Sequence, residues 1–436
     1  MKYRLYTILV ALLMAAAPMW AQKHKTHQPD ELPSQLSEDF DDNDKASGGD
    51  AASLDMRLSL DEASLSAFMA QPLAQDMVPI LRSDLLTSSQ MGVMVWDLTT
   101  DSCLFRYNDQ WRMRPASTQK LVTAITALDL LGENHKFSTK LFYTGTVNAE
   151  SRTLTGNLYC VGGMDPCFGT DDMQQFVNAV KALGVDTIRG NIFADLSFKD
   201  DKLLGEGWCW DDDNPTLSPL LFNHKAEFAV AFLTKLRAGG LYVDAGTGSQ
   251  STPSSARQIC NVERRLTDVL QPMMKKSDNE AAEAVFYQVA NRQGGRQASA
   301  KSARIAVERV MRKAGLNPSD YYVADGSGLS LYNYVTPAMH VSLLRYAHQH
   351  PSIYQALALS LPVAGIDGTL ASRMKTGSAR SNVRAKTGTV TGVSSLAGYC
   401  TASNGHKLCF AIINQGQSNN TNARNLQDRI CQQLCK

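Results

Sequence analysis

The fold is decided by the stretch Met113-Arg114-Pro115-Ala116-Ser117-Thr118-Gln119-Lys120 and by the apolar residues that follow it. Beyond Lys120 the apolar side chains recur at helical spacing, at Leu121, Val122, Ile125, Leu128 and Leu131. Gly132 is expected to end this helix. Ser117 therefore stands at the start of a buried helix, and Lys120, three residues later, shares a face with it.

This placement suits nucleophilic chemistry. A serine needs a base within hydrogen-bond reach, and Lys120 can supply one to Ser117. The start of a helix adds free backbone N–H groups and a positive end, which stabilise developing negative charge. A second Ser-x-x-Lys match, Ser372 to Lys375, is followed by polar residues without helical periodicity. We therefore expect Ser117 to be the nucleophile and Ser372 to be a loop serine.

Two further triplets follow in the chain. Ser277-Asp278-Asn279 lies at an interruption between two apolar helical stretches; alone, it is typical of a helix cap. Lys386-Thr387-Gly388 lies in a strand-like run, and with Thr389 its side chains can bind a carboxylate. Duplicates of both triplets, Lys375-Thr376-Gly377 and Ser418-Asn419-Asn420, lie in polar loops. Ser-x-x-Lys, Ser-Asp-Asn and Lys-Thr-Gly in this order are the signature of penicillin-binding proteins and class A β-lactamases.

The match extends well beyond the three triplets. It includes the segments Gly156-Asn157-Leu158-Tyr159, Gly162-Gly163-Met164-Asp165-Pro166, Asp325-Gly326-Ser327-Gly328-Leu329-Ser330, Leu361-Pro362-Val363-Ala364-Gly365 and Asp367-Gly368-Thr369-Leu370. On these motifs the sequence resembles the serine D-alanyl-D-alanine carboxypeptidase/endopeptidases, the low-molecular-mass class C penicillin-binding proteins. The resemblance covers most of the chain after about residue 80, and it is looser around residues 208–223.

The resemblance implies an α/β (α+β) transpeptidase/β-lactamase-like fold, with an antiparallel sheet flanked by helices and an inserted, mostly β domain. It also implies acyl transfer on peptidoglycan stem peptides, with β-lactams as covalent inhibitors. Whether the enzyme trims terminal D-Ala, cuts cross-links or does both stays open. The alternatives are a β-lactamase and a non-catalytic wall-binding or β-lactam-sensing module.

Each candidate site residue then has an expected role. Ser117 attacks, and its backbone N–H and that of Thr389 stabilise the oxyanion. Lys120 takes the serine proton as a neutral base, with a pKa lowered by nearby Lys386. Ser277 relays a proton between Lys120 and the leaving amine, and Asn279 holds the substrate backbone and Lys120. The expected substrate-binding residues are Asn279, Lys386, Thr387, Gly388 and Thr389.

No cofactor or metal is expected. His348-Gln349-His350 contains the closest pair of histidines, and a lone pair at that spacing is more often a surface feature than a ligand set. The formal net charge of +1 gives no argument for nucleic acid as a partner.

The domain organisation is read from composition and pattern. Residues 1–21 resemble a cleaved export signal, with a basic start and an apolar run too short to span a bilayer comfortably. Residues 22–55 are acidic and poor in large apolar side chains, as in a solvated linker. We assign residues 56–134 and 261–436 to the catalytic domain and residues 135–260 to the β-rich insert. The mature protein is then expected outside the cytoplasm, without an integral membrane segment.

Nine cysteines in an exported chain leave at least one thiol without an internal partner. Cys400 and Cys409 lie symmetrically about Asn404-Gly405, a favoured two-residue hairpin turn. In that register they form a non-hydrogen-bonded pair, in which the two chains come closest and a disulfide fits. A disulfide and two buried thiols are about equally expected. Cys160 and Cys167 flank a turn and could also pair.

Overall fold

A computed structural model describes residues 62–291 and 297–436. The predicted export signal (1–21) and acidic linker (22–55) lie outside the described residues. Within the described ranges, no helix combines the length and the apolar character needed to span a bilayer.

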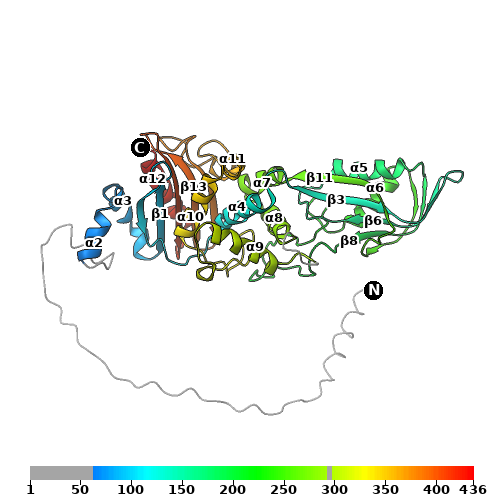
Figure 1. Ribbon diagram of the computed structural model, residues 1–436, viewed down its shortest axis with the longest axis horizontal. Helices are drawn as coiled ribbons and strands as arrows, with labels where there is room; N and C mark the ends of the chain where they lie inside the picture. The colour runs from blue at the N-terminus through cyan, green and yellow to red at the C-terminus, as the bar shows by residue number, and fades with distance from the viewer. Residues whose placement is uncertain (1–61, 292–296) are drawn as a thin grey trace, which may run out of the picture. The chain divides into compact units, whose positions relative to one another are not determined.

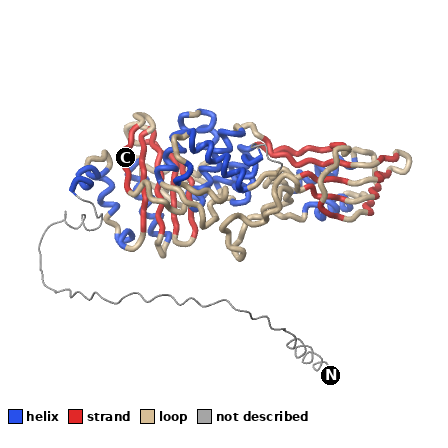
Figure 2. Tube along the Cα trace, turned by 60° about the horizontal axis from the view of Figure 1, so that its bottom comes forward, coloured by secondary structure: helices blue, strands red, loops and turns tan. Residues whose placement is uncertain are grey.

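A five-stranded antiparallel sheet is built from the two ends of the described chain (Figures 1 and 2). Its strand order is β12-β13-β14-β1-β2. In the sequence, the strand-like runs 91–98 and 103–107 predict a hairpin, and the runs 383–390, 393–401 and 408–414 predict a C-terminal meander. Both are confirmed, and pairing of β1 with β14 joins them. The strands are β1 (Gln90–Asp97), β2 (Ser102–Tyr107), β12 (Arg384–Val390), β13 (Val393–Thr401) and β14 (Lys407–Gln415).

Helices cover both faces of this sheet. Successive side chains of a strand point to opposite faces, so each strand can pack against helices on both sides. On β13, Leu396 and Cys400 join an apolar cluster with α3 (Ala74–Leu81) and α12 (Asn420–Leu434). Ala397 and Tyr399, on the opposite face, join the largest cluster of buried side chains. The sheet is thus the middle layer of an antiparallel α/β arrangement, as expected.

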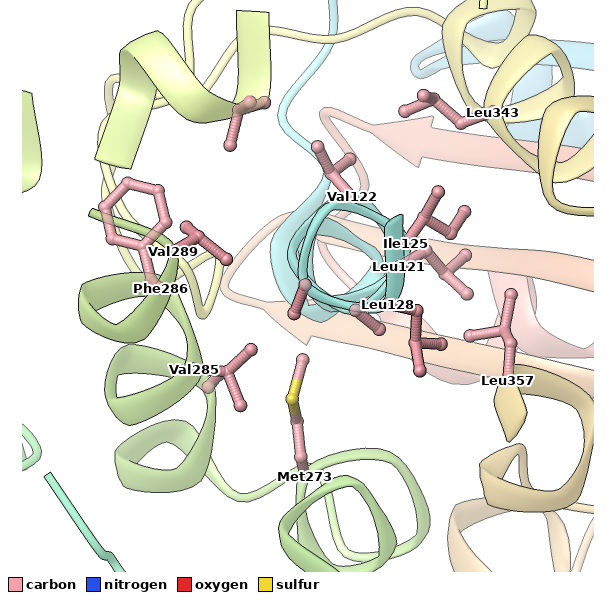
Figure 3. Close-up of a cluster of buried hydrophobic side chains, with 14 of the residues drawn as sticks. Leu121, Val122, Ile125, Leu128, Met273, Val285, Phe286, Val289, Leu343 and Leu357 are labelled. Atoms are coloured by element: carbon pink, nitrogen blue, oxygen red, sulfur yellow. The ribbon is translucent and has the colours of Figure 1, made fainter. Parts of the chain in front are cut away.

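Helix α4 (Gln119–Leu131) lies in the middle of the largest cluster (Figure 3). Its apolar residues pack against Met273, Val285 and Phe286 from the two helices around the Ser-Asp-Asn triplet. Burying one Leu or Ile side chain contributes roughly 1.5–3 kcal/mol. Gly132 ends the helix with a positive φ of 80°, as predicted. The core therefore fixes the helix that follows Ser117.

The remaining helices come from the N-terminal and central parts of the described chain. The apolar pattern of residues 263–276 predicts a helix, but α7 begins only at Leu266, because Arg257–Arg265 forms a strand. These helices are α2 (Glu62–Met69), α7 (Leu266–Lys275), α8 (Asn279–Asn291), α9 (Ala300–Lys313), α10 (Pro337–Gln349) and α11 (Pro351–Ser360). Short 3-10 turns occupy η1 (Asp84–Thr87), η2 (Ala116–Thr118), η3 (Pro318–Asp320) and η4 (Gly368–Leu370).

The segment predicted to be a β-rich insert has two sheets and an apolar cluster of its own. Their orders are β10-β8-β6-β3-β11 and β4-β5-β7-β9. The strands are β3 (Lys136–Tyr143), β4 (Thr146–Asn148), β5 (Thr153–Thr155), β6 (Leu158–Val161), β7 (Thr187–Arg189), β8 (Ile192–Asp195), β9 (Tyr242–Asp244), β10 (Thr247–Ser249) and β11 (Arg257–Arg265). Two helices that the sequence analysis did not predict, α5 (Thr170–Lys181) and α6 (Phe228–Ala238), supply much of the cluster.

The suggested Cys400–Cys409 disulfide is wrong, because the hairpin register differs by one residue. The loop holds three residues rather than two, since the Ala402 N–H donates to the His406 carbonyl. Cys400 then pairs with Leu408, and Cys409 with Tyr399. A shift of one residue puts the two thiols on opposite faces of the sheet. Cys160 and Cys167 are not bonded either; all nine cysteines, which lie within the described ranges, are free thiols.

Candidate active site

Ser117 lies in the turn η2, directly before α4. The preceding Ala116 has a φ of +47°, a left-handed conformation that costs a non-glycine residue about 1–2 kcal/mol. The turn is held by two hydroxyl groups, since Thr118 Oγ1 and Ser395 Oγ donate to the Pro115 carbonyl at 2.7 and 2.5 Å. Local strain held by surrounding contacts is common at functional sites.

Lys120 is fully buried and reaches back to Ser117, as the helical spacing predicted. Its Nζ lies 3.0 Å from Ser117 Oγ. It also donates to Asn279 Oδ1 at 2.7 Å and to the Ser327 carbonyl at 2.8 Å. Three acceptors thus surround the amine, from η2, the start of α8 and the loop after η3.

Burial lowers the pKa of Lys120 to about 8, while the nearby carboxyl groups of Asp325, Glu283 and Asp278 act to raise it. The expected main cause was repulsion from Lys386, and this is corrected: removal from water is the largest effect on Lys120. The pKa of Lys386 is itself lowered well below its usual value, first by burial and then by the Lys120 charge. A group of pKa about 8 is neutral in about one molecule in ten at pH 7.

The Ser277-Asp278-Asn279 triplet divides its roles between capping and the site. Asp278 Oδ1 accepts from the Ala281 N–H at 2.9 Å and so caps α8. Ser277, with a φ of +61°, lies toward the strand β12, and Asn279 lies toward Lys120. The capping interpretation was therefore appropriate for the middle residue of the triplet.

Residues 386–389 lie on β12, the edge strand of the central sheet. Lys386 Nζ donates to Ser277 Oγ at 2.9 Å and to the Thr387 carbonyl at 2.7 Å. Thr387 Oγ1 donates to Thr369 Oγ1 at 2.7 Å, and Thr389 Oγ1 accepts from Arg424 at 3.3 Å. The triplet therefore places Lys386, together with several hydroxyl groups, at one edge of the sheet.

Gly388 is the point at which β12 meets the Ser117 turn. A Cβ added there would lie 2.1 Å from Ser395 Oγ, 2.7 Å from the Pro115 carbonyl oxygen and 3.0 Å from the Ser117 N. Real Cβ atoms do not approach this closely, so only glycine allows the strand to lie against the turn.

We predict that Gly388→Ala slows acylation of Ser117 by about 10-fold or more, because relieving the overlap costs about 1–3 kcal/mol and moves β12 away from the turn. The check is the second-order rate constant for labelling by fluorescent penicillin. Gly248→Ala is the matched control, since its added Cβ would meet only ordinary contacts of 3.4 Å or more. Wild-type labelling by Gly388→Ala would contradict the prediction.

The duplicate motifs lie outside this arrangement. Ser372 and Lys375 are both solvent-exposed. Asn419 caps α12, where its Oδ1 accepts from the Thr421 N–H at 2.8 Å. In the part of the chain that the structure describes, no group of three or more His, Cys, Asp or Glu side chains is placed to hold a metal ion.

Sequence reasoning did not predict a buried acidic pair beside Lys120. Glu283 accepts from the backbone N–H groups of Gly326 and Ser327, and burial raises its pKa to about 8. Asp325 accepts from the indole N–H of Trp208 at 2.8 Å. The segment 325–330 had been noted as a motif, but a role that depends on its main chain leaves no distinct side-chain pattern in the sequence.

Comparison with known proteins identifies the family of the chain. The D-Ala-D-Ala carboxypeptidase 3 (S13) family matches residues 73–221 and 216–435. A D-alanyl-D-alanine carboxypeptidase of Actinomadura sp. (strain R39) is 28% identical over 82% of this chain and 83% of its own length. The D-alanyl-D-alanine carboxypeptidase DacB of Haemophilus influenzae is 25% identical over 78% and 88%.

Solved structures show the same fold. Penicillin-binding protein 4 (dacB) from Haemophilus influenzae superposes with a TM-score of 0.75 at 23% identity, covering 83% of this chain and 99% of that one. Its complex with a β-lactam gives a TM-score of 0.69 at 25% identity, with the same coverage. The chain belongs to the D-Ala-D-Ala carboxypeptidase 3 (S13) family, as the resemblance of its motifs indicated.

Proposed function

We propose that this chain hydrolyses peptides ending in D-Ala-D-Ala, through an acyl-enzyme on Ser117. The observation that carries the proposal is the 3.0 Å approach of the Lys120 amine to Ser117 Oγ within a buried site. Burial lowers the pKa of Lys120 to about 8, which gives the amine a basic, neutral form near physiological pH.

In the first half of the reaction, Ser117 Oγ attacks the carbonyl carbon between the two D-Ala residues, and Lys120 takes its proton. The carbonyl oxygen becomes an oxyanion that receives hydrogen bonds from the backbone N–H groups of Ser117 and Thr389. Ser277 passes its hydroxyl proton to the leaving nitrogen and is reprotonated by Lys120, which returns to its neutral form. The C–N bond then breaks and free D-Ala leaves, with the acyl group as an ester on Ser117.

In the second half, Lys120 removes a proton from water, which attacks the ester carbonyl. Lys120 then gives this proton to Ser117 Oγ as the ester bond breaks and the shortened peptide leaves. A β-lactam would follow the first half alone and remain attached to Ser117. The proposal thus includes β-lactams as covalent inhibitors and peptidoglycan stem peptides as substrates.

The carboxylate of the terminal D-Ala would bind at β12. Lys386 contributes a donor from the strand edge, and the hydroxyl groups of Thr387 and Thr389 lie on the same strand. Asn279 would hold the substrate backbone with its amide N–H₂ while its oxygen accepts from Lys120. We further propose that residues 1–21 direct export and that residues 135–260 form a separate inserted domain.

The test uses the purified mature chain with three substrates. A peptide ending in D-Ala-D-Ala should release D-Ala, and fluorescent penicillin should label the tryptic peptide that carries Ser117. Cross-linked wall peptides, followed by mass spectrometry, distinguish endopeptidase from carboxypeptidase cleavage. Labelling of another serine, or no release from either kind of peptide, would refute the proposal. Rapid turnover of a chromogenic cephalosporin would indicate a β-lactamase instead.

A further inference from the structure

A neutral lysine has two N–H bonds and one lone pair, so its value as a base depends on where that lone pair points. Two of the three partners of Lys120, Asn279 Oδ1 and the Ser327 carbonyl oxygen, can only accept hydrogen bonds. When Lys120 is neutral, these two acceptors take both of its hydrogens. The lone pair is then left facing Ser117 Oγ, 3.0 Å away.

The Ser327 carbonyl belongs to the loop Asp325–Ser330, and a buried carboxyl group on α8 holds this loop in place. Glu283 Oε1 accepts from the Ser327 N–H at 2.8 Å and from the Gly326 N–H at 3.1 Å, and its Oε2 lies 3.3 Å from the Gly326 N. Glu283 is 2% exposed, so water does not compete for these bonds. A side chain one turn beyond Asn279 thus fixes the peptide unit that precedes Ser327.

The loop is also packed tightly against its surroundings. A Cβ added at Gly326 would lie 2.5 Å from Phe286 Cβ, and one added at Gly328 would lie 1.9 Å from the Ala116 carbonyl oxygen. The loop therefore touches both α8 and the strained residue before Ser117. A shift of the loop would move the Lys120 acceptor and the nucleophile turn together.

Asp325 anchors the other end of the loop. Its carboxylate accepts from the Gly328 and Ser330 N–H groups at 2.8 and 2.7 Å. The Asn333 amide and the Trp208 indole N–H donate to it at 2.7 and 2.8 Å. Trp208 comes from the segment predicted as the insert, so this bond connects that segment to the loop beside Lys120.

We propose that Glu283 is a positioning residue, which acts through the Asp325–Ser330 loop to aim the lone pair of Lys120 at Ser117. The inference rests on the proposed function, since it assigns a supporting role within the same acyl-transfer site. Glu283 does not touch the reacting atoms. It holds the N–H groups of Gly326 and Ser327, while Asp325 holds the Gly328 N–H in the peptide unit of the Ser327 carbonyl, and together they keep this acceptor of the amine in place.

The charge of Glu283 and its hydrogen bonds to the loop make separable contributions to the action of Lys120 as a base. The groups around Lys120 are Asp325 on the loop, Asp278 before α8, Glu283 on α8 and Lys386 on β12. Glu283 also faces Tyr287, whose pKa is raised mainly by burial and further by this carboxyl group. The pKa of Glu283 is itself about 8, so its carboxyl group is charged in only part of the molecules near neutral pH. Where it is charged it raises the pKa of Lys120, so its removal should lower that pKa.

The experiment compares acylation by fluorescent penicillin and D-Ala release in wild type, Glu283→Gln and Glu283→Ala across pH 5–10. Glutamine keeps an oxygen for both backbone N–H groups, so the rates of Glu283→Gln should stay within about 10-fold of wild type. The acidic limb of its pH–rate profile should move to lower pH. Glu283→Ala frees the loop and should lose about 100-fold in kcat with KM nearly unchanged. Asp97→Asn, at a buried carboxylate of β1 that bonds His406, is the control for loss of a buried acid.

Several outcomes would overturn the inference. A folded Glu283→Ala with wild-type rates would show that the loop needs no such anchor. Equal losses of kcat in Glu283→Ala and Glu283→Gln would show that the charge of Glu283 matters and that placement of the Ser327 carbonyl does not. If Glu283→Ala fails to fold, Trp208→Phe is the second variant, since it keeps an aromatic ring but removes the indole N–H that Asp325 accepts. A wild-type kcat in Trp208→Phe would contradict the role of the loop in placing Lys120. Failure of wild type itself to label at Ser117 would refute the proposed function instead.

Discussion

Ser117→Ala should abolish both labelling by fluorescent penicillin and release of D-Ala. Removing a serine nucleophile costs about 10⁴-fold or more in rate, because the remaining hydrogen bonds can still bind the substrate but cannot form the acyl-enzyme. The change removes one oxygen from a partly exposed side chain, so the free energy of unfolding should change by about 0.5 kcal/mol or less.

The matched control is Ser372→Ala, the serine of the duplicate Ser-x-x-Lys motif. Ser372 is solvent-exposed, so its replacement should leave labelling within about 2-fold of wild type. Thermal melting of both variants separates loss of chemistry from loss of fold. Retained labelling in Ser117→Ala, or loss of labelling in Ser372→Ala, would contradict the assignment.

The local part of this site was predictable from the sequence, because it depends on helical spacing. Ser117 and Lys120 are three residues apart at the start of a helix whose apolar face is easily read. The hairpin β1–β2 and the meander β12–β14 were likewise visible as alternating runs separated by turns. Motif order then indicated which remote segments should approach Ser117, but it carried no distances.

The parts that failed depend on backbone detail or on burial. The turn at Asn404-Gly405 holds three residues where two were predicted, which shifts the pairing of the two strands by one residue. Cys400 and Cys409 then lie on opposite faces of the sheet, and the suggested disulfide between them fails for that reason. A sequence shows charges directly, and it therefore indicates repulsion from Lys386 as the cause of the lowered pKa of Lys120. Burial, the larger cause, becomes visible only when α4, α8 and β12 are assembled.

Helix α5 was missed for a different reason. Its buried residues Met173, Phe176, Val177 and Val180 follow helical spacing, and the signal was present. The short strands on both sides suggested that the whole segment was β structure. The role of Ser327 had no comparable signal, because its contact with Lys120 is made by a backbone carbonyl.

Lys120→Met should reduce acylation by at least about 10³-fold, because the serine proton then has no nearby base. Methionine is unbranched and of similar length, so it can follow the buried path of the lysine without overpacking. It leaves Asn279 Oδ1 and the Ser327 carbonyl without their Lys120 hydrogen, and it also removes the cost of burying an amine. These effects oppose each other, so folding should be preserved.

The dependence on pH tests the role of the amine as a base. Lys120 is protonated below its pKa of about 8, so wild-type acylation should rise with pH up to about 8 and then level off. Lys120→Met should lose this rise together with the rate, whereas Lys375→Met, at the exposed lysine of the duplicate motif, should keep both. A wild-type rate that is flat between pH 6 and pH 9 would contradict the role, since a base that must lose its proton cannot act equally well on both sides of its pKa.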